Sequence, residues 1–220
     1  MERIDINGVE VFIEEAENYI QVNDISESDL TKVWGHLIKQ YPEYEVNFCF
    51  RNVTIPIDIL SDIGAEILDD CIKMQLTSND YIFCESYEVE QLKKEDFASF
   101  AAFHDKAYPE MYWTSTRLLD KWDNWRIFVT KNGDKIIGYT LLLIAMKDKL
   151  MGEIFCVAAD NFAHHKALLS VSVNYAFENG KNIVIYMTDR DNTLEQDSAL
   201  AVGFKNVGFY KAFRAIAQQK

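Results

Sequence analysis

The chain has 220 residues, of which 49% are hydrophobic and 26% are charged, and its formal net charge is −13. This composition is typical of a globular protein, and the length allows one large domain or two small ones. The acidic balance argues against nucleic-acid binding, and no apolar run is long enough to span a bilayer. The first residues lack a basic start and an apolar segment. We therefore expect no signal peptide, no nucleic-acid or membrane partner, and a cytoplasmic protein.

Residues 1–85 carry the whole excess of negative charge. They contain 18 acidic and 5 basic side chains, whereas residues 86–220 contain 17 of each. This asymmetry indicates two units with different surfaces. Two explanations stay open, which are solubility and docking of a cationic partner.

The pattern of residues 1–85 predicts a smaller α/β unit. Val9–Glu14 and Tyr19–Asn23 read as strands, and a helix over Ser28–Gln40 begins after Ser26 or at Ser28. Further along, the pattern predicts a strand at Glu45–Asn52, a helix at Ile57–Ile63 and a strand at Asp70–Leu76.

Residues 86–220 predict a mixed sheet flanked by helices. The strongest local signal is Asn132-Gly133 between two β-rich runs, which is typical of a hairpin. Strand–helix–strand units joined to a hairpin favour an α/β (α+β) fold with helices on both faces of the sheet. The expected strands are Tyr87–Gln91, Arg126–Lys131, Asp134–Ile144, Glu153–Ala159, Asn182–Thr188 and Val207–Ala217, and the expected helices are Glu95–Tyr108, Ser115–Trp122, Ala163–Asn179 and Asn192–Val202.

The two segments share an order of elements near their ends. A strand and a helix precede Gly64 and also Gly203, and after each glycine comes another strand. The matched offsets favour a partial internal repeat, and chance similarity of two ordinary α/β units is the alternative.

Four cysteines, Cys49, Cys71, Cys84 and Cys156, lie far apart and form no C-x-x-C pair. We expect reduced, buried thiols and no metal site.

The order of elements in residues 86–220 resembles the GNAT superfamily of acyl-CoA-dependent N-acyltransferases. The most specific residues are Asn192 and Gly203-Phe204, because many members have an Asn, a helix and then Gly-Phe eleven residues after the Asn. The resemblance covers about 135 residues. It implies a GNAT-like central mixed sheet, acetyl-CoA as co-substrate, and transfer of the acyl group to an amine. It also assigns Asn192 to coenzyme binding.

The start of the helix predicted after the strand at Glu153–Ala159 is a candidate phosphate site. Backbone N–H groups at a helix N-terminus lack intrahelical partners and attract anions, and coenzyme A carries a pyrophosphate. The candidate groups are the amides of Ala163, His164, His165, Lys166 and Ala167, with Lys166 adding a cation and the two histidines offering further donors. The resemblance implies that the backbone of Cys156, Val157 and Ala158 pairs with the pantetheine arm, in a gap between two splayed strands.

Three positions depart from the family pattern. The usual motif Gln/Arg-x-x-Gly-x-Gly/Ala becomes Phe162, His165 and Ala167, so a bulky side chain replaces a glycine. The histidines are open to two readings, phosphate contact or a solvated helix start. The tyrosine that many relatives have four residues before Gly-Phe, where it serves as general acid, is Ala199 here.

Catalytic candidates follow from what aminolysis requires. Glu153 is the predicted general base, since a nearby carboxylate accepts a proton from the amine, although it could equally be an exposed strand residue. Ser198, Tyr186 or Tyr210 are candidates to replace the missing tyrosine. The aromatic turn at 108–113 borders the acceptor pocket in the family, so Glu110, Tyr112 and Trp113 are candidates to bind a cationic amine, with core packing as the alternative.

The sequence therefore predicts an N-acetyltransferase that moves an acyl group directly from acetyl-CoA to a small-molecule or peptide amine, as a monomer or homodimer without a metal. The alternative is a GNAT-like module that has lost catalysis and serves as a binding or interaction protein. A weaker third reading is a structural domain whose sheet is extended by residues 1–85.

Overall fold

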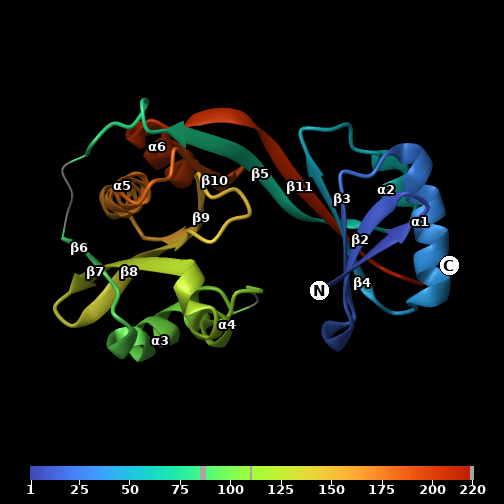
Figure 1. Ribbon diagram of the computed structural model, residues 1–220, viewed down its shortest axis with the longest axis horizontal. Coiled ribbons are helices and arrows are strands. Elements are labelled where there is room, and N and C mark those ends of the chain that lie inside the picture. The colour runs from blue at the N-terminus through green and yellow to red at the C-terminus, as the bar shows by residue number, and fades with distance from the viewer. Residues whose placement is uncertain (85–87, 110, 219–220) are drawn as a thin grey trace. The chain divides into compact units, whose positions relative to one another are not determined.

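A computed structural model describes residues 1–84, 88–109 and 111–218 (Figure 1). The chain divides into two compact units, one comprising residues 1–72 and 208–220 and the other residues 73–207. Two long strands, β5 (Glu66–Thr77) and β11 (Lys205–Ile216), contribute to both units. The bounds of these compact units differ from the predicted domains 1–85 and 86–220, and the domain division stays a prediction.

The first unit has the strand order β1-β2-β3-β4-β11-β5. Strands β3 and β4 are parallel, and the pairs β1–β2, β2–β3 and β4–β11 are antiparallel. Its further elements are β1 (Glu2–Ile6), β2 (Val9–Glu14), β3 (Tyr19–Asn23), α1 (Glu27–Gln40), β4 (Glu45–Arg51) and α2 (Ile57–Asp62).

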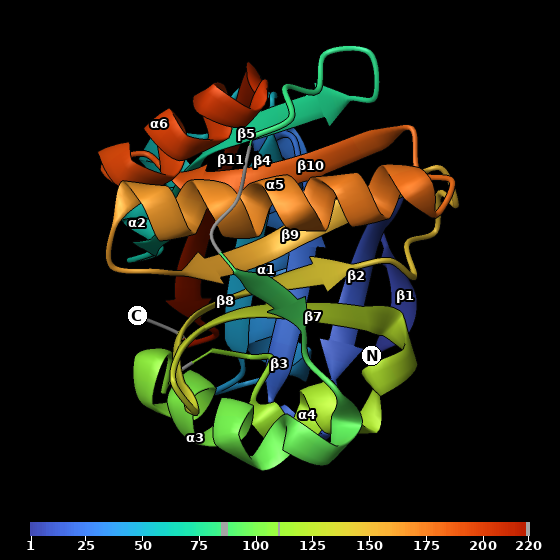
Figure 2. The same cartoon turned by 90° about the vertical axis from the view of Figure 1, so that its left-hand side faces the viewer.

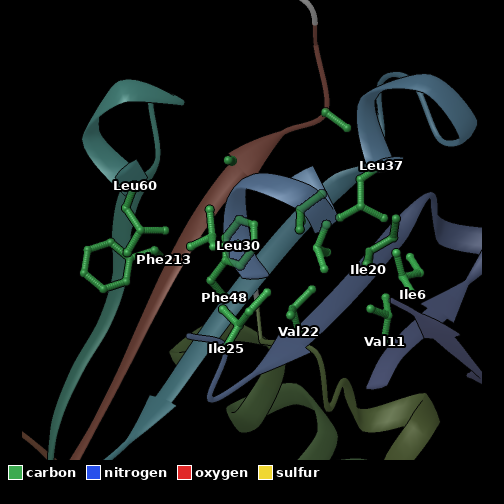
Figure 3. Packing of buried hydrophobic residues seen from close by; sticks show 14 of the residues in the cluster. Ile6, Val11, Ile20, Val22, Ile25, Leu30, Leu37, Phe48, Leu60 and Phe213 are labelled. Carbon is green, nitrogen blue, oxygen red and sulfur yellow. The ribbon is translucent and has the colours of Figure 1, made fainter. Parts of the chain in front are cut away.

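The core of the first unit lies between its strands and the two helices (Figure 3). Helix α1 begins where the Ser26 side chain accepts a hydrogen bond from the Asp29 amide, as an N-cap does. Its buried face presents Leu30, Val33 and Leu37 at helical spacing. Inward side chains of β2, β3 and β4 meet this face, because alternate residues of a strand point to the same side.

The strand β1 was missed by the sequence analysis. Asn7 and Gly8 both have positive φ, at 56° and 85°, as a two-residue hairpin turn with the right twist requires. The signal was the same Asn-Gly pair that correctly predicts the hairpin at Asn132-Gly133. Strand β5 is also longer than expected, since it begins at Glu66 rather than Asp70.

The second unit has the strand order β11-β5-β10-β9-β8-β7-β6. Its further elements are β6 (Val89–Gln91), α3 (Phe97–Ala107), α4 (Ser115–Asp120), β7 (Trp125–Asn132), β8 (Lys135–Leu143), β9 (Met151–Ala158), α5 (Phe162–Glu178), β10 (Ile183–Asp189) and α6 (Thr193–Val202). Each predicted helix and strand of this segment has a counterpart, although Tyr87 lies outside the described residues. The predicted mixed sheet with helices is confirmed.

Helices cover both faces of the sheet in the second unit (Figure 2). On β8, a Cβ on Gly138 would meet Leu168 of α5, whereas the next residue, Tyr139, contacts Phe100 of α3. Successive strand residues point to opposite faces, so α5 covers one face and α3 covers the other. Where a cofactor or substrate enters, it has to do so from a strand end or between strands.

The order of elements from β1 to β5 repeats from β7 to β11. A hairpin, a third strand, a helix, a parallel strand, a helix and a long last strand occur as β1 to β5 and again as β7 to β11. The two last strands are exchanged in the sheet order, because β11 follows β4 and β5 precedes β10. This symmetry supports the internal repeat, which stays a prediction.

Candidate functional site

A gap opens between the parallel strands β9 and β10. They pair from Met151 to Ile154 on β9 and from Ile183 to Tyr186 on β10. Beyond Ile154, β9 continues to Ala158 with β8 as its neighbour on one side, and the pairing with β10 has ended. A register shift against β8 between Leu141 and Leu142 leaves Phe155 as an extra residue, which bends the strand at this point. The part of β9 that is unpaired with β10 includes Cys156, Val157 and Ala158, and their role in binding a pantetheine arm stays a prediction.

The N-terminus of α5 lies at the end of β9. Asn161 caps the helix, and its side-chain Oδ1 accepts from the His164 amide at 2.9 Å. The His165 amide donates to the Asn161 carbonyl at 3.0 Å. Helix geometry leaves the amides of Phe162 and Ala163 without intrahelical acceptors. Among the predicted phosphate-binding amides, the Ala163 amide is therefore the one left by helix geometry without an acceptor inside the helix.

Charged groups at this helix start act in opposite directions. The Lys166 ammonium lies 5.7 Å from the centre of the Phe162 ring. The exposed Asp160 carboxylate lies 3.6 Å from Nδ1 of His164. A phosphate placed here gains from the helix dipole and Lys166, and it loses from Asp160. The arrangement fits a thin pantetheine chain in the gap better than it fits a tightly held pyrophosphate.

The His165 side chain points into the protein. It is 1% exposed and packs against Tyr186, with ring centres 6.4 Å apart. Neither ring nitrogen has a hydrogen-bond partner among the described residues. Burial lowers the pKa of His165 to about 4, so the ring is neutral at pH 7. The expectations of a solvated histidine and of a phosphate donor from this ring are both wrong, because α5 turns the ring toward β10.

The Cys156 thiol is buried in the sheet beside the gap. Its Sγ lies 4.0 Å from the Tyr139 hydroxyl. Burial raises the pKa of this thiol to about 12, so it is protonated at neutral pH. A thiol in this state is a weak nucleophile.

Glu153, the predicted base, lies on β9 opposite Ile185 of β10. It is half-buried, and burial raises the pKa of its carboxyl while Lys73 of β5 opposes the shift. A carboxylate with a raised pKa is suited to accept a proton. Its catalytic role stays a prediction.

Glu195 is a second half-buried carboxyl group and was missed by the sequence analysis. It lies in the first turn of α6, where its amide donates to Oδ1 of Asn192 at 3.2 Å and its Oε2 accepts from the Asp189 amide at 3.0 Å. Burial is the main cause that raises the pKa of Glu195 to about 7, and the charge of Asp189 adds to it. Asn192 and Glu195 stand three residues apart, which reads in sequence as an ordinary helix-capping pair. A capping pair in the sequence does not indicate that the Glu195 carboxylate is half-buried.

Three side chains around the gap sense the charge of Glu195. Burial is the main cause of the raised pKa of Cys156, Tyr186 and Tyr108, and the Glu195 carboxylate raises each of them further. These residues belong to β9, β10 and the end of α3. Tyr186 also lowers the pKa of Glu195, while its hydroxyl makes no hydrogen bond within 3.5 Å among the described residues. Glu195 thus interacts electrostatically with side chains of β9, β10 and the end of α3.

The other candidates for the missing tyrosine are placed differently. The Ser198 hydroxyl is buried and has no partner within the described chain. The Tyr210 hydroxyl donates to Sγ of Cys49 at 3.3 Å, within the first unit. Ala199 is fully buried in α6. Of the three candidates, Tyr186 is among the groups that affect the pKa of Glu195.

The aromatic turn after α3 is anchored to the core. His104 of α3 bonds both the Tyr139 hydroxyl, at 2.6 Å, and the Trp113 carbonyl, at 2.7 Å. Trp113 packs on Trp125 with ring centres 5.0 Å apart, and the guanidinium of Arg117 covers the Tyr112 ring. These contacts favour the core-packing alternative for Trp113, whereas Tyr112 is exposed and its role stays a prediction. Glu110 lies outside the described residues.

The first unit has a hollow of its own at the matching helix start. It measures about 280 Å³ and lies at the N-terminus of α1, with Asp24, Glu27 and Pro56 in its lining. Its two carboxylates disfavour a phosphate group. Within residues 1–84, 88–109 and 111–218, no group of three His, Cys, Asp or Glu side chains is arranged to hold a metal ion. None of the helices described is both long enough and apolar enough to span a bilayer.

Solved structures with similar folds exist, although no protein-family model and no curated protein matches the sequence. The GCN5-related N-acetyltransferase from Sphaerobacter thermophilus superposes with a TM-score of 0.70 and 13% identity, over 96% of this chain and 77% of that chain. The GCN5-related N-acetyltransferase from Kribbella flavida superposes with a TM-score of 0.71 and 8% identity, over 97% of this chain and 89% of that chain. A tandem GNAT protein from the clavulanic acid biosynthesis pathway superposes with a TM-score of 0.64 and 12% identity, over 96% of this chain and 79% of that chain. These likenesses include residues 1–85 as well as the second segment.

Proposed function

From the premise that this chain has the fold of the GCN5-related N-acetyltransferases, we propose that it transfers an acyl group from acetyl-CoA to an amine. The gap between β9 and β10 is the observation that carries the proposal. Parallel pairing ends at Ile154 and Tyr186, and the next residues of β9 have backbone groups that an extended chain can pair with. A pantetheine arm has amide groups suited to this role, as in the addition of a strand to a sheet edge.

The residues of the gap favour direct transfer. The only thiol at the gap within the described residues, that of Cys156, is protonated at neutral pH because burial raises its pKa to about 12. The amine nitrogen therefore attacks the thioester carbonyl without a covalent enzyme intermediate. Glu153 is the proposed base that takes a proton from the amine. Holding the two reactants together supplies much of the rate in such a reaction.

A second candidate function is binding without catalysis. Ala199, which stands where many relatives have the general acid, motivates this candidate. The two candidates differ in turnover, since a binding module stabilises the thioester complex and releases no thiol.

Thiol release from acetyl-CoA tests the proposal. We expect release above the no-enzyme rate with at least one member of a panel of polyamines, amino acids, aminoglycosides and peptides with free N-termini. Intact mass after incubation with acetyl-CoA alone is expected to show no acetylated protein. Binding of acetyl-CoA with no release across the panel would instead support the binding module, and accumulation of acetylated protein would contradict direct transfer.

A further inference from the structure

Helix α6 lacks the tyrosine that the corresponding helix carries in many GNAT proteins, and Ala199 stands in its place. Residues four apart on a helix lie on the same face, one turn apart, and helical side chains lean toward the N-terminus. The side chain of a residue at position 199 therefore extends over the turn that contains Glu195. The carboxyl of Glu195 lies on the face that a tyrosine from position 199 would cover.

Two hydrogen bonds position Glu195, one through its backbone amide and one through its carboxyl. Asn192 accepts from the Glu195 amide, which sets the first turn of α6, and the Asp189 amide donates to Oε2 at 3.0 Å. The groups of other elements that interact electrostatically with the carboxyl are Asp189 and Tyr186 of β10, Cys156 of β9 and Tyr108 at the end of α3. Burial and the charge of Asp189 raise the pKa of this carboxyl, while the Asp189 amide and the Tyr186 hydroxyl lower it. A carboxyl group in these surroundings retains a proton more readily than one in water.

We propose that Glu195 is the catalytic acid that protonates the departing coenzyme A sulfur, in the role that a tyrosine has at position 199 in relatives. This inference rests on the proposed acyl transfer. When the amine nitrogen attacks the carbonyl carbon, a C–N bond forms and the C–S bond breaks with its electron pair passing to sulfur. The Glu195 carboxyl gives its proton to sulfur, and the proton lost by the nitrogen returns to Glu195 through Glu153 or water. The products are the amide and the free thiol, and the enzyme is unchanged.

Glu195→Gln tests the role with little change in shape. The amide oxygen of glutamine still accepts from the Asp189 amide, but the side chain no longer donates a proton as an acid. With the amine that gives the fastest wild-type rate, we expect kcat to fall by about 10²- to 10⁴-fold, as removal of a general acid does. The KM for acetyl-CoA and the rise in melting temperature that acetyl-CoA produces are expected to stay close to those of the wild type. The matched control is Asp197→Asn, an exposed carboxylate two residues along the same helix, which is expected to keep kcat within about twofold.

The pH profile and a rescue variant separate an acid from a structural residue. Wild-type kcat is expected to decline above about pH 7 as Glu195 loses its proton, and this decline is expected to be absent from the residual activity of Glu195→Gln. Adding Ala199→Tyr to Glu195→Gln is expected to restore kcat by at least about tenfold, because a phenol then reaches the same sulfur.

Three outcomes overturn the inference while the wild type turns over. These are a kcat of Glu195→Gln within about threefold of the wild type, loss of acetyl-CoA binding with the activity, and no recovery from Ala199→Tyr in a folded double variant. A wild type that neither binds acetyl-CoA nor releases thiol contradicts the proposed function itself.

Discussion

Replacing His165 by leucine tests how the start of α5 is built. The ring is 1% exposed, and both nitrogens lack partners in the described part of the chain. A buried polar group without a hydrogen bond costs about 1–3 kcal/mol, and leucine has a similar volume and a better helix propensity. We therefore expect the free energy of unfolding at pH 7 to rise by about 1–3 kcal/mol in His165→Leu.

The pH dependence of stability gives a second signature of the same substitution. The pKa of His165 is lowered from 6.5 to about 4, so the unfolded chain binds a proton that the folded chain refuses, and stability falls as the pH falls from 6.5 toward 4. The pKa of Glu195 is raised from 4.5 to about 7, so stability falls as the pH rises from 4.5 to 7. Each shift is worth at most about 3 kcal/mol, and the two oppose each other in the wild type. His165→Leu is expected to lack the loss with falling pH that His165 causes, and Glu195→Gln is expected to lack the loss with rising pH that Glu195 causes.

Urea titrations followed by tryptophan fluorescence between pH 4 and pH 7.5 measure both effects. His36→Leu is the matched control, because His36 is an exposed histidine of α1. It is expected to change the free energy of unfolding by no more than about 0.5 kcal/mol and to keep the wild-type pH dependence. A His165→Leu protein that is less stable at pH 7, or whose pH dependence matches the wild type, would refute a buried, unpaired and neutral His165.

Three further substitutions probe the fold and the site. Gly203→Ala is expected to lower the melting temperature clearly more than Gly180→Ala, because both glycines have positive φ but a Cβ at Gly203 also collides with a backbone carbonyl; equal losses would contradict this. Tyr139→Phe leaves one nitrogen of the buried His104 ring without a partner and is expected to cost about 1–3 kcal/mol in urea unfolding, whereas a neutral effect would mean that the hydrogen bond is unimportant. Asn161→Gly removes the side-chain cap from the first turn of α5 and is expected to leave acetyl-CoA affinity, measured by calorimetry, unchanged or tighter; a tenfold loss would show that Asn161 itself holds the coenzyme.

Local signals in the sequence were sufficient for much of the fold. Asn132-Gly133 predicts the hairpin, and both strands beside it follow. Asn132 pairs with Lys135, and Gly133 takes the left-handed position of the turn, with a φ of 60°. The stop of α6 at Gly203 follows from the same physics, since its φ of 106° favours glycine. The exchange of β5 and β11 was beyond such signals. Which strand lies beside β4 depends on pairing between segments more than 150 residues apart, such as Phe213 with Phe48.

The site was predictable only where backbone geometry decides it. The gap beside Cys156 follows from the resemblance and needs no particular side chain. The direction of the His165 ring and the burial of Glu195 depend on how α5 and α6 pack on β10, and no residue pattern within either helix encodes that. Glu195 was overlooked because Asn192 three residues earlier explains it as a capping residue. The structure shows instead that its carboxylate bonds the Asp189 amide.

Binding of acetyl-CoA is the most direct test of the central claim, which is that the β9–β10 gap accepts an acyl-pantetheine chain. Thermal melts at rising acetyl-CoA concentration measure it without knowledge of the acceptor. The account predicts a stabilisation that grows with ligand concentration, reaching about 2.7 kcal/mol at one hundred times Kd. No change in melting temperature at millimolar acetyl-CoA, and none with longer acyl-CoA thioesters, would contradict it.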